Sequence, residues 1–523
     1  MNESSGHSGD ISESSLRSGD ISVSSKTLGH ISAGLYRSTA GAIKELVSNA
    51  FDANATVVRI TTNWPRFHPI TCSDDGDGMT IDQFEALMKG GIGDSSKREE
   101  GRQVTRTGRP IIGRIGIGIF GIAQFCYEFQ IWSHHRETET GFWARVQLID
   151  YLQEKIDQTE AGKEADYDVG RYECEAIQYD ADKAGLTVVA TDVKKGFVQR
   201  FAASPGKRLP RDFRQALKKY TACRSVQQLG DYWNMVWQLC VVCPVTYVET
   251  GPVRGENAIP EIRQELEDYN FRVVVDGMRL YRPPLLPSPY RRDGWNHRLY
   301  PISTDSEVDG KRLRLGGYLF MQDGFAVVPA ELRGVLVRVK NVGIGSYDKS
   351  LFDYPIAQGP RFGWISGEIY GLEGLEDALN VDRDSFNESH PHFLEVRTIL
   401  HEKLEAIFSQ VYKDMRARSG RDESKRAARR QELFRQQIAD VAGEAYDIHE
   451  SAGTQETAVA VDAESRTIFV NPEGPWPSKA GDRELAQQLA VAYELSQSAR
   501  TRNGKRDTFL NLLGRVLKIH GRW

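Results

Sequence analysis

The chain has few cysteines, no excess of positive charge and no long apolar run. Six cysteines in 523 residues are too few for a disulfide framework. No apolar segment approaches the roughly 18 residues of a membrane-spanning helix, and the Ser- and Gly-rich N-terminus lacks the basic and apolar regions of a secretion signal. We therefore expect a cytoplasmic protein that has no membrane contact and keeps its thiols reduced.

Charge balance and cysteine spacing exclude two further simple assignments. The 67 basic and 72 acidic residues give a net charge of −5, so the overall charge gives no argument for nucleic-acid binding. Cys240 and Cys243 have the C-x-x-C spacing, but no second pair and no nearby histidine accompanies them. We interpret both as buried core thiols, not as metal or redox ligands.

Length and composition predict several regions. A chain of 523 residues is long enough for about three domains. Residues 1–27 are dominated by serine and glycine with almost nothing apolar to bury, which predicts a disordered tail. We predict two α/β domains, at 28–250 and 251–392, followed by a charged, mostly helical region at 393–523. The expected fold class is α+β.

Hydrophobic periodicity and capping residues place individual elements. Alternation predicts strands at 57–61, 70–73, 129–133, 142–148 and 187–191, and in the second α/β unit at 271–275, 313–320 and 335–342. Thr80 and Gln83 match a capping box, so a helix should run through Met88. The C-terminal region is predicted to contain a helix at 393–437, a hairpin at 457–470 and helices from Arg483 and Asp507.

One helical segment, residues 43–55, carries polar side chains in a pattern that suits a ligand. Its apolar residues recur at the i, i+3, i+4, i+7 spacing of one helix face. Glu45, Asn49 and Asp52 follow one another at i, i+4 and i+7 on a second face. Two carboxylates and a carboxamide in one row can hold a metal and a water over a ligand, although such a stripe alone is more often a solvated face.

Two glycine-rich turns follow this helix in the chain. D-D-G-D-G-M at 74–79 comes directly after a predicted strand, and G-R-I-G-I-G-I-F-G at 113–121 ends a loop rich in Gly, Ser and Arg. The second turn also fits the G-x-G-x-x-G dinucleotide pattern. A dinucleotide site would leave Glu45, Asn49 and Asp74 without a role, so we favour one site made by all three motifs.

The order and spacing of these three motifs resemble those of the GHKL superfamily of ATPases, which includes gyrase B, ninety-kilodalton heat-shock chaperones, sensor histidine kinases and MutL. The chaperone branch is the most similar, because D-A-L-N-V-D-R-D-S-F at 377–386 looks like a segment of the chaperone middle domain. The resemblance implies a Bergerat-type ATP-binding α/β sandwich over 28–250, with a lid at about 90–121, and a transducer-like middle domain at 251–392.

The resemblance also implies a role for each matching residue. Glu45 would orient or deprotonate the attacking water, Asn49 would hold Mg²⁺, and Asp74 would accept a hydrogen bond from the adenine amine. Arg383 would reach the γ-phosphate of ATP from the middle domain. The other implied nucleotide contacts are Asp52, Gly76, Gly78, Met79, Ser96, Lys97, Gly113, Gly116, Gly118 and Thr187. Chaperones usually carry threonine where this chain has Leu186, so Thr187 is the expected substitute beside adenine.

The function that this resemblance implies is slow ATP hydrolysis that drives a chaperone-like conformational switch on a client protein, with an ATP-dependent homodimer as a further expectation. Two alternatives stay open. One is a MutL- or MORC-like ATP-gated nucleic-acid clamp, because residues 200–224 and 416–430 are rich in Lys and Arg. The other is an ATP-dependent adaptor that does not hydrolyse the nucleotide.

Overall fold

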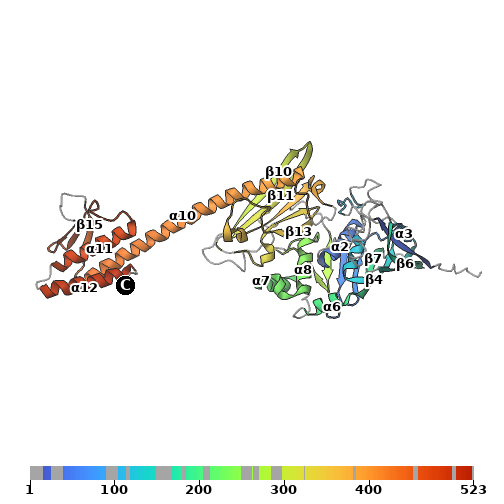
Figure 1. The fold of residues 1–523 in the computed structure, drawn as a ribbon, viewed down its shortest axis with the longest axis horizontal. Coiled ribbons are helices and arrows are strands. Elements are labelled where there is room, and N and C mark those ends of the chain that lie inside the picture. The colour runs from blue at the N-terminus through green and yellow to red at the C-terminus, as the bar shows by residue number, and fades with distance from the viewer. Residues whose placement is uncertain are drawn as a thin grey trace, which may run out of the picture. The chain divides into compact units, whose positions relative to one another are not determined.

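The structure is a computed structural model, and it describes residues 16–24, 39–89, 104–112, 118–148, 166–178, 184–203, 212–248, 262, 270–283, 297–322, 324, 326–380, 385–451, 458–497 and 502–520. The chain forms two compact units, Met1–Lys403 and Leu404–Trp523. The described elements mix helices with antiparallel and parallel strands, so the expected α+β class is confirmed (Figure 1).

The first unit contains a nine-stranded sheet in the order β1-β6-β5-β4-β7-β3-β2-β8-β9. Its strands are β1 (Arg17–Ser24), β2 (Val57–Thr61), β3 (Ile70–Asp74), β4 (Cys126–His134), β5 (Thr140–Leu148), β6 (Asp166–Gln178), β7 (Gly185–Val193), β8 (Arg272–Val275) and β9 (Met278–Arg279). Neighbouring strands are antiparallel, except that β2 and β8 are parallel.

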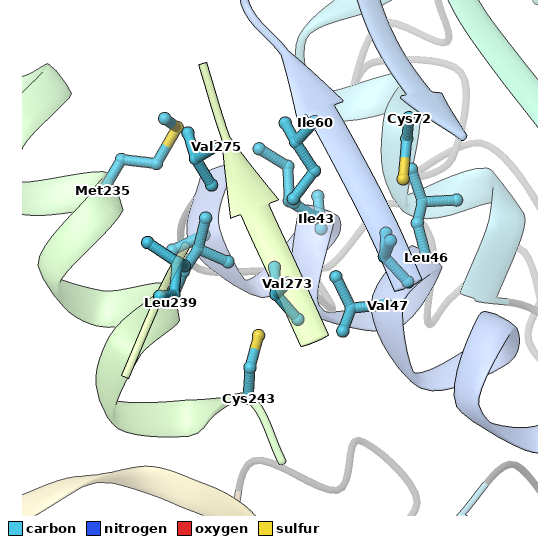
Figure 2. Close-up of a cluster of buried hydrophobic side chains, with 14 of the residues drawn as sticks. Ile43, Leu46, Val47, Ile60, Cys72, Met235, Leu239, Cys243, Val273 and Val275 are labelled. Carbon is cyan, nitrogen blue, oxygen red and sulfur yellow. The ribbon is translucent and has the colours of Figure 1, made fainter. Parts of the chain in front are cut away.

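Helices around this sheet include α2 (Thr39–Asp52), α3 (Ile81–Met88), α6 (Lys195–Ala202), α7 (Phe213–Ala222) and α8 (Asp231–Val242). The predicted capping box at the start of α3 is confirmed, because Thr80 Oγ1 accepts from Gln83 N and Gln83 Oε1 accepts from Thr80 N. The apolar face of α2 packs on β2 and β8, and α8 closes the same core (Figure 2). The side chains that meet there include Ile43, Leu46, Val47, Ile60, Met235, Leu239, Cys243, Val273 and Val275.

The cysteines within the described residues are free thiols, and five of the six are buried. Cys240 lies on α8 and Cys243 directly follows it, inside the core. Burial raises the pKa of Cys243 to about 12, which keeps its thiol protonated at neutral pH. The interpretation of this pair as core thiols is confirmed.

Two sequence-based expectations about the first sheet are wrong. Residues 17–24 were expected within the disordered tail, but they form β1, in which Ile21 is fully buried and Arg17 Nη1 donates to Glu85 Oε2 of α3 at 3.1 Å. Residues 271–275 were expected to open the middle domain, but β8 instead pairs with β2 and joins the first sheet. Both errors concern strands whose partners lie far away in the sequence, where local composition carries no signal.

A five-stranded sheet in the order β10-β11-β14-β12-β13 follows within the same unit. Its strands are β10 (His297–Val308), β11 (Lys311–Gln322), β12 (Gly334–Val339), β13 (Val342–Asp348) and β14 (Ile365–Glu373). Buried Tyr318, Leu336 and Tyr370 of this middle sheet belong to the same core cluster as Val236 of α8. The two sheets of the first unit therefore share one continuous core.

Helix α10 (Pro391–Ala442) begins in the first unit and ends in the second, and it covers the predicted helix at 393–437. The second unit also contains β15 (Asp447–Glu450), β16 (Val459–Asp462), β17 (Thr467–Val470), α11 (Ala480–Gln497) and α12 (Arg502–Ile519). The predicted hairpin is confirmed as β16 and β17, and β15 adds to it in parallel. Across the described ranges, every helix is too short or too polar to cross a membrane.

The buried side chain of β1 provides a test of its place in the fold. Ile21→Ala should lower the free energy of unfolding by about 2–4 kcal/mol, because it removes a fully buried side chain and leaves a cavity. Urea denaturation followed by far-UV circular dichroism measures the change. Ser18→Ala, at an exposed position of the same strand, is the control and should be neutral. Equal stability of the two variants would show that β1 does not pack here.

Candidate functional site

Helix α2 presents only a narrow polar opening. Eleven of its 14 residues are buried, and the exceptions are Thr39, Glu45 and Asn49. Glu45 and Asn49 lie one helical turn apart, so both open on the same side. A solvated face would expose a broader stripe, whereas the Glu45 side chain keeps only 15% of its surface and lies 3.7 Å from the ammonium of buried Lys44. The pair is placed to meet a ligand at one confined point.

The C-terminal end of α2 holds the segment that leads into the second glycine-rich turn. Asp52 is buried, and its Oδ1 accepts from Ile112 N at 2.7 Å. Arg109 adds a second link by donating to Ala55 O at 2.6 Å. Asp52, predicted as a nucleotide contact, therefore has a structural bond that fixes the backbone directly before Gly113.

Three carboxylates, at the end of β3 and in the turn that follows it, differ in the groups that they bond. Asp75 accepts from Thr56 N and Val57 N at 2.7 and 2.8 Å. Burial would raise the pKa of Asp75, but these bonds and that from the Thr56 hydroxyl lower it. Asp77 pairs with two guanidinium groups, those of Arg106 and Arg136. Both side chains are thus occupied in holding the turn.

Asp74 differs from its two neighbours. Its Oδ1 accepts from Gly76 N at 2.9 Å, and no described side chain forms an ion pair with it. Burial raises the pKa of Asp74 to about 6. Burying a carboxylate without a neighbouring cation destabilises the folded protein when no ligand is bound. Asp74 is therefore the carboxylate here that best suits a ligand with an N–H donor.

The glycines of this turn are required by the protein's own backbone. Gly78 has a φ of +73°, and a Cβ there would lie 2.1 Å from His134 O. A Cβ on Gly76 would lie 2.7 Å from Ala53 O, at the end of α2. The turn therefore lies against the residue that directly follows α2, with Gly76 two residues after Asp74 and Ala53 four residues after Asn49. Met79, the expected apolar wall, packs against the core and bonds through its backbone to Ser133.

Thr187 is not brought together with Asp74. In the β3–β7 ladder Asp74 pairs with Leu186, whereas Thr187 pairs with Ser73 and donates to its Oγ at 2.9 Å. Side chains of adjacent strand residues point to opposite faces of a sheet, so Thr187 and Asp74 face apart. The proposed contact of Thr187 with adenine stays a prediction from the resemblance, without support from this geometry.

Several predicted site residues lie outside the described residues. These are Ser96, Lys97, Gly113, Gly116 and Arg383. Gly118 begins a 3₁₀ helix, η1 (Gly118–Gln124), which packs against α2. Of the second glycine-rich turn, the structure thus shows its two flanks, each attached to α2.

Lys340 was missed by the sequence reasoning. It lies with Asn341 in the tight turn between β12 and β13, and its Nζ donates to Ile111 O at 3.1 Å. The middle sheet therefore contacts Ile111, and Asp52 bonds the next residue, Ile112. Lys340 and Asn341 have φ values of 49° and 66°. Asparagine suits this conformation and lysine does not, but the φ values are known only from the structure, so the sequence held no signal for Lys340.

Comparison with known proteins agrees with the ATPase motifs. Residues 36–173 match the family model described as histidine kinase-, DNA gyrase B-, and HSP90-like ATPase. The N-terminal part of the chain is thus a GHKL-type ATPase domain. That description spans several kinds of ATPase and does not select the chaperone branch.

A curated relative matches a shorter stretch of the chain. It is described as a putative type II restriction enzyme, HgiDII, of Herpetosiphon aurantiacus. The two sequences are 41% identical over 96 residues, which are 18% of this chain and 15% of the relative. The similarity therefore concerns one part of each protein.

The raised pKa of Asp74 gives a prediction for both stability and binding. In the unfolded chain the carboxyl has its ordinary pKa of 3.8, whereas in the folded protein it is about 6. Ionisation of Asp74 therefore lowers the free energy of unfolding as the pH rises from about 4 to about 6. The loss is complete above about pH 6 and amounts to at most about 3 kcal/mol. Asp74→Asn should raise the free energy of unfolding at pH 7.5 and bind ATP at least about tenfold more weakly.

Denaturation at several pH values and calorimetric titration with ATP measure these effects. The stability gain of Asp74→Asn should vanish below about pH 4, where the wild-type carboxyl is protonated in both states. Asp75→Ala is the control and should destabilise the fold, because it removes the oxygen that accepts from both Thr56 N and Val57 N. A loss of stability in Asp74→Asn at pH 7.5 would contradict the assignment of Asp74 to a ligand.

Proposed function

We propose that this protein is an ATP-binding and ATP-hydrolysing conformational switch. The observation that carries the proposal is the opening of Glu45 and Asn49 on an otherwise buried α2, beside a turn in which Asp74 alone lacks a side-chain partner among the described residues. The match of residues 36–173 to an ATPase family supports it. The proposal includes hydrolysis, for which Glu45 is the candidate general base.

The residues fit the chemistry of a nucleotide triphosphate. The Asp74 carboxylate can accept a hydrogen bond from the exocyclic amine at C6 of adenine, a position at which guanine carries a carbonyl oxygen and so cannot donate. The side-chain oxygen of Asn49 is a ligand type that Mg²⁺ accepts, and bound Mg²⁺ would neutralise phosphate charge. Glu45, one turn away, can then hold and deprotonate a water, a contribution of roughly 10²–10⁴ in rate.

Lys340 is our candidate for the cation that the middle sheet brings to the phosphates. Its ammonium contacts the Ile111 carbonyl, two residues before Gly113, where the second glycine-rich turn starts. A lysine supplied by another part of the chain makes hydrolysis depend on the closed arrangement, so turnover would report closure. Arg383 was predicted for this role from the resemblance, and it remains the alternative.

Hydrolysis and binding can be separated by substitution. Glu45→Ala should bind ATP with Mg²⁺ as the wild type does and lose at least about a hundredfold in steady-state turnover. Asn49→Ala should weaken nucleotide binding itself, because it removes the proposed Mg²⁺ ligand. Lys340→Ala should lower kcat with little change in the Kd for ATP, and Arg383→Ala is the matched test of the other cation.

Phosphate release and calorimetry measure these quantities. If the wild type binds ATP without any turnover, the ATPase proposal is wrong and the non-hydrolysing adaptor is favoured instead. Turnover that survives unchanged in Glu45→Ala would remove Glu45 from the mechanism. A loss in Arg383→Ala but not in Lys340→Ala would return the cation role to the chaperone-like segment.

A second candidate function is ATP-gated binding of nucleic acid. Helix α7 has no acidic residue, and its exposed cations are Arg214, Lys218 and Lys219, followed by Arg224 after the helix. Such a surface suits phosphate groups. The relative described as a putative restriction enzyme makes this partner class more attractive than a protein client, although chaperone-like action on a client in the cytoplasm and ATP-dependent dimerisation stay part of the proposal.

Charge reversal on α7 tests the nucleic-acid candidate. Arg214→Glu with Lys218→Glu should weaken binding of duplex DNA or RNA and reduce the salt dependence of the remaining affinity, because phosphate contacts release counterions. Lys219 is left unchanged because its ammonium lies 4.3 Å from the Trp233 ring centre. The matched control reverses Lys425 and Arg429, which are exposed on α10. Loss of binding in the control alone would move the surface to 416–430, and no wild-type binding at low salt would reject this candidate.

A further inference from the structure

A buried charged network lies within the first unit, where the ATPase sheet meets the middle sheet. Arg282, Arg338 and Glu368 are exposed by 0%, 1% and 2%. Glu368 of β14 accepts from Arg338 Nε at 2.7 Å and from Tyr347 Oη, also at 2.7 Å. Burial would raise the pKa of Glu368, but Arg338 lowers it to about 2, so the carboxylate is charged at neutral pH.

Two members of this network come from the ATPase side. Arg282 follows β9 and Tyr247 follows α8, and the two form a parallel bridge with each other. The Tyr247 hydroxyl donates to Glu368, and Arg282 Nη1 donates to Tyr370 Oη at 2.7 Å. The Tyr370 hydroxyl donates in turn to Glu368 Oε2 at 2.9 Å. The network thus ties the end of the ATPase sheet to β14.

The same arginine also holds the turn that carries Lys340. Arg282 Nη2 donates to Asn341 O at 2.7 Å and to the Asn341 side-chain oxygen. Its planar guanidinium therefore connects Tyr370 of β14 with the β12–β13 turn in one rigid fork. Lys340 is adjacent to Asn341 in that turn and contacts Ile111.

Burying this network between the two sheets costs free energy, because charged groups lose their hydration. Two arginines face one glutamate, and burial raises the pKa of Tyr370 to about 12, so the hydroxyls add no negative charge. Among the described residues, Arg282 Nε, Arg338 Nη1 and Asn341 Nδ2 are buried donors without an acceptor. Apolar side chains of similar size would give comparable or greater stability. The retained charges therefore call for an explanation beyond stability.

We propose that Arg282 is a positioning residue, which acts through Asn341 to hold Lys340 against the Ile111 carbonyl, and that the Glu368 network fixes Arg282 for this task. The inference rests on the proposed function, because Lys340 is there the cation offered to the phosphates. Movement of β14 relative to the ATPase sheet changes the position of Arg282 and hence of Lys340. The Lys340 side chain thus links the middle sheet to the Ile111 segment.

A double-mutant cycle tests this inference. Arg282→Lys keeps the buried charge opposite Glu368 but lacks the fork that joins Tyr370 to Asn341. We expect the Kd for ATP to stay within about twofold and kcat to fall about tenfold or more, as misplacement of a reacting group does. Lys340→Ala should cause a similar fall, and the double variant should be no slower than Lys340→Ala. Multiplied effects in the double variant would overturn the proposal.

A readout without nucleotide separates this inference from the ATPase proposal. Hydrogen exchange at the Ile112 amide, which is bonded to Asp52, should speed up in Arg282→Lys and in Lys340→Ala, because both release Ile111. This result would stand even for a protein without turnover. Unchanged Ile112 exchange in Arg282→Lys would overturn the positioning role.

Two further variants complete the design. Arg333→Lys is the matched control, because Arg333 donates to Val327 O at 2.8 Å, outside the network. It should leave both kcat and the Ile112 exchange at the wild-type level. Asn341→Gly keeps the positive φ of the turn and removes only the side-chain acceptor, so it tests the same link with little risk to folding. It should shift both readouts in the direction of Arg282→Lys, and wild-type values in this variant would count against the Asn341 link.

Discussion

The almost complete burial of α2 is the constraint on which the rest of the first unit depends. A helix can be covered on nearly every side only when a sheet, a second helix and a loop all pack against it. Here β2 and β8, α8, and the segment at 104–112 supply that cover. The positions left open, apart from Thr39 at the start of the helix, are Glu45 and Asn49. The polar opening is thus a product of packing around the helix, and changes in any covering layer would alter it.

Helix α8 has a second role that follows from the same packing. It contacts α2 on the ATPase side and β13 on the middle side, where a Cβ on Gly343 would lie 3.1 Å from the Cα of Val242. The two sheets therefore meet across one shared helix, with apolar contact on α8 and polar contact around Glu368. The apolar contact stabilises the packing of the two sheets but is not directional, whereas the hydrogen bonds of Arg282 fix the orientation of one sheet relative to the other.

Local signals in the sequence predicted the elements that depend on neighbours in the chain. The capping box of α3 and the limits of β2 are examples, because side chains three residues apart and strict alternation are visible in the sequence itself. Partners far along the chain were not predictable, as β1 and β8 show. The candidate site likewise combines residues that local sequence patterns identify with contacts that they do not. Asp74, Asp75 and Asp77 look alike in the sequence, and only their distant partners single out Asp74, while the contact of Lys340 with Ile111 links positions that no local pattern connects.

The parallel pairing of β2 with β8 has a consequence for the order of folding on the ribosome. Val57 pairs with Arg272, so the strand that completes this side of the ATPase sheet is synthesised long after the rest of the sheet. Until β8 emerges, the apolar surfaces of β2 and α2 have no cover on that side and stay open to wrong contacts. The first sheet is therefore incomplete until β8 has been made, and a fragment that stops near residue 250 would expose the apolar side chains that Val273 and Val275 cover.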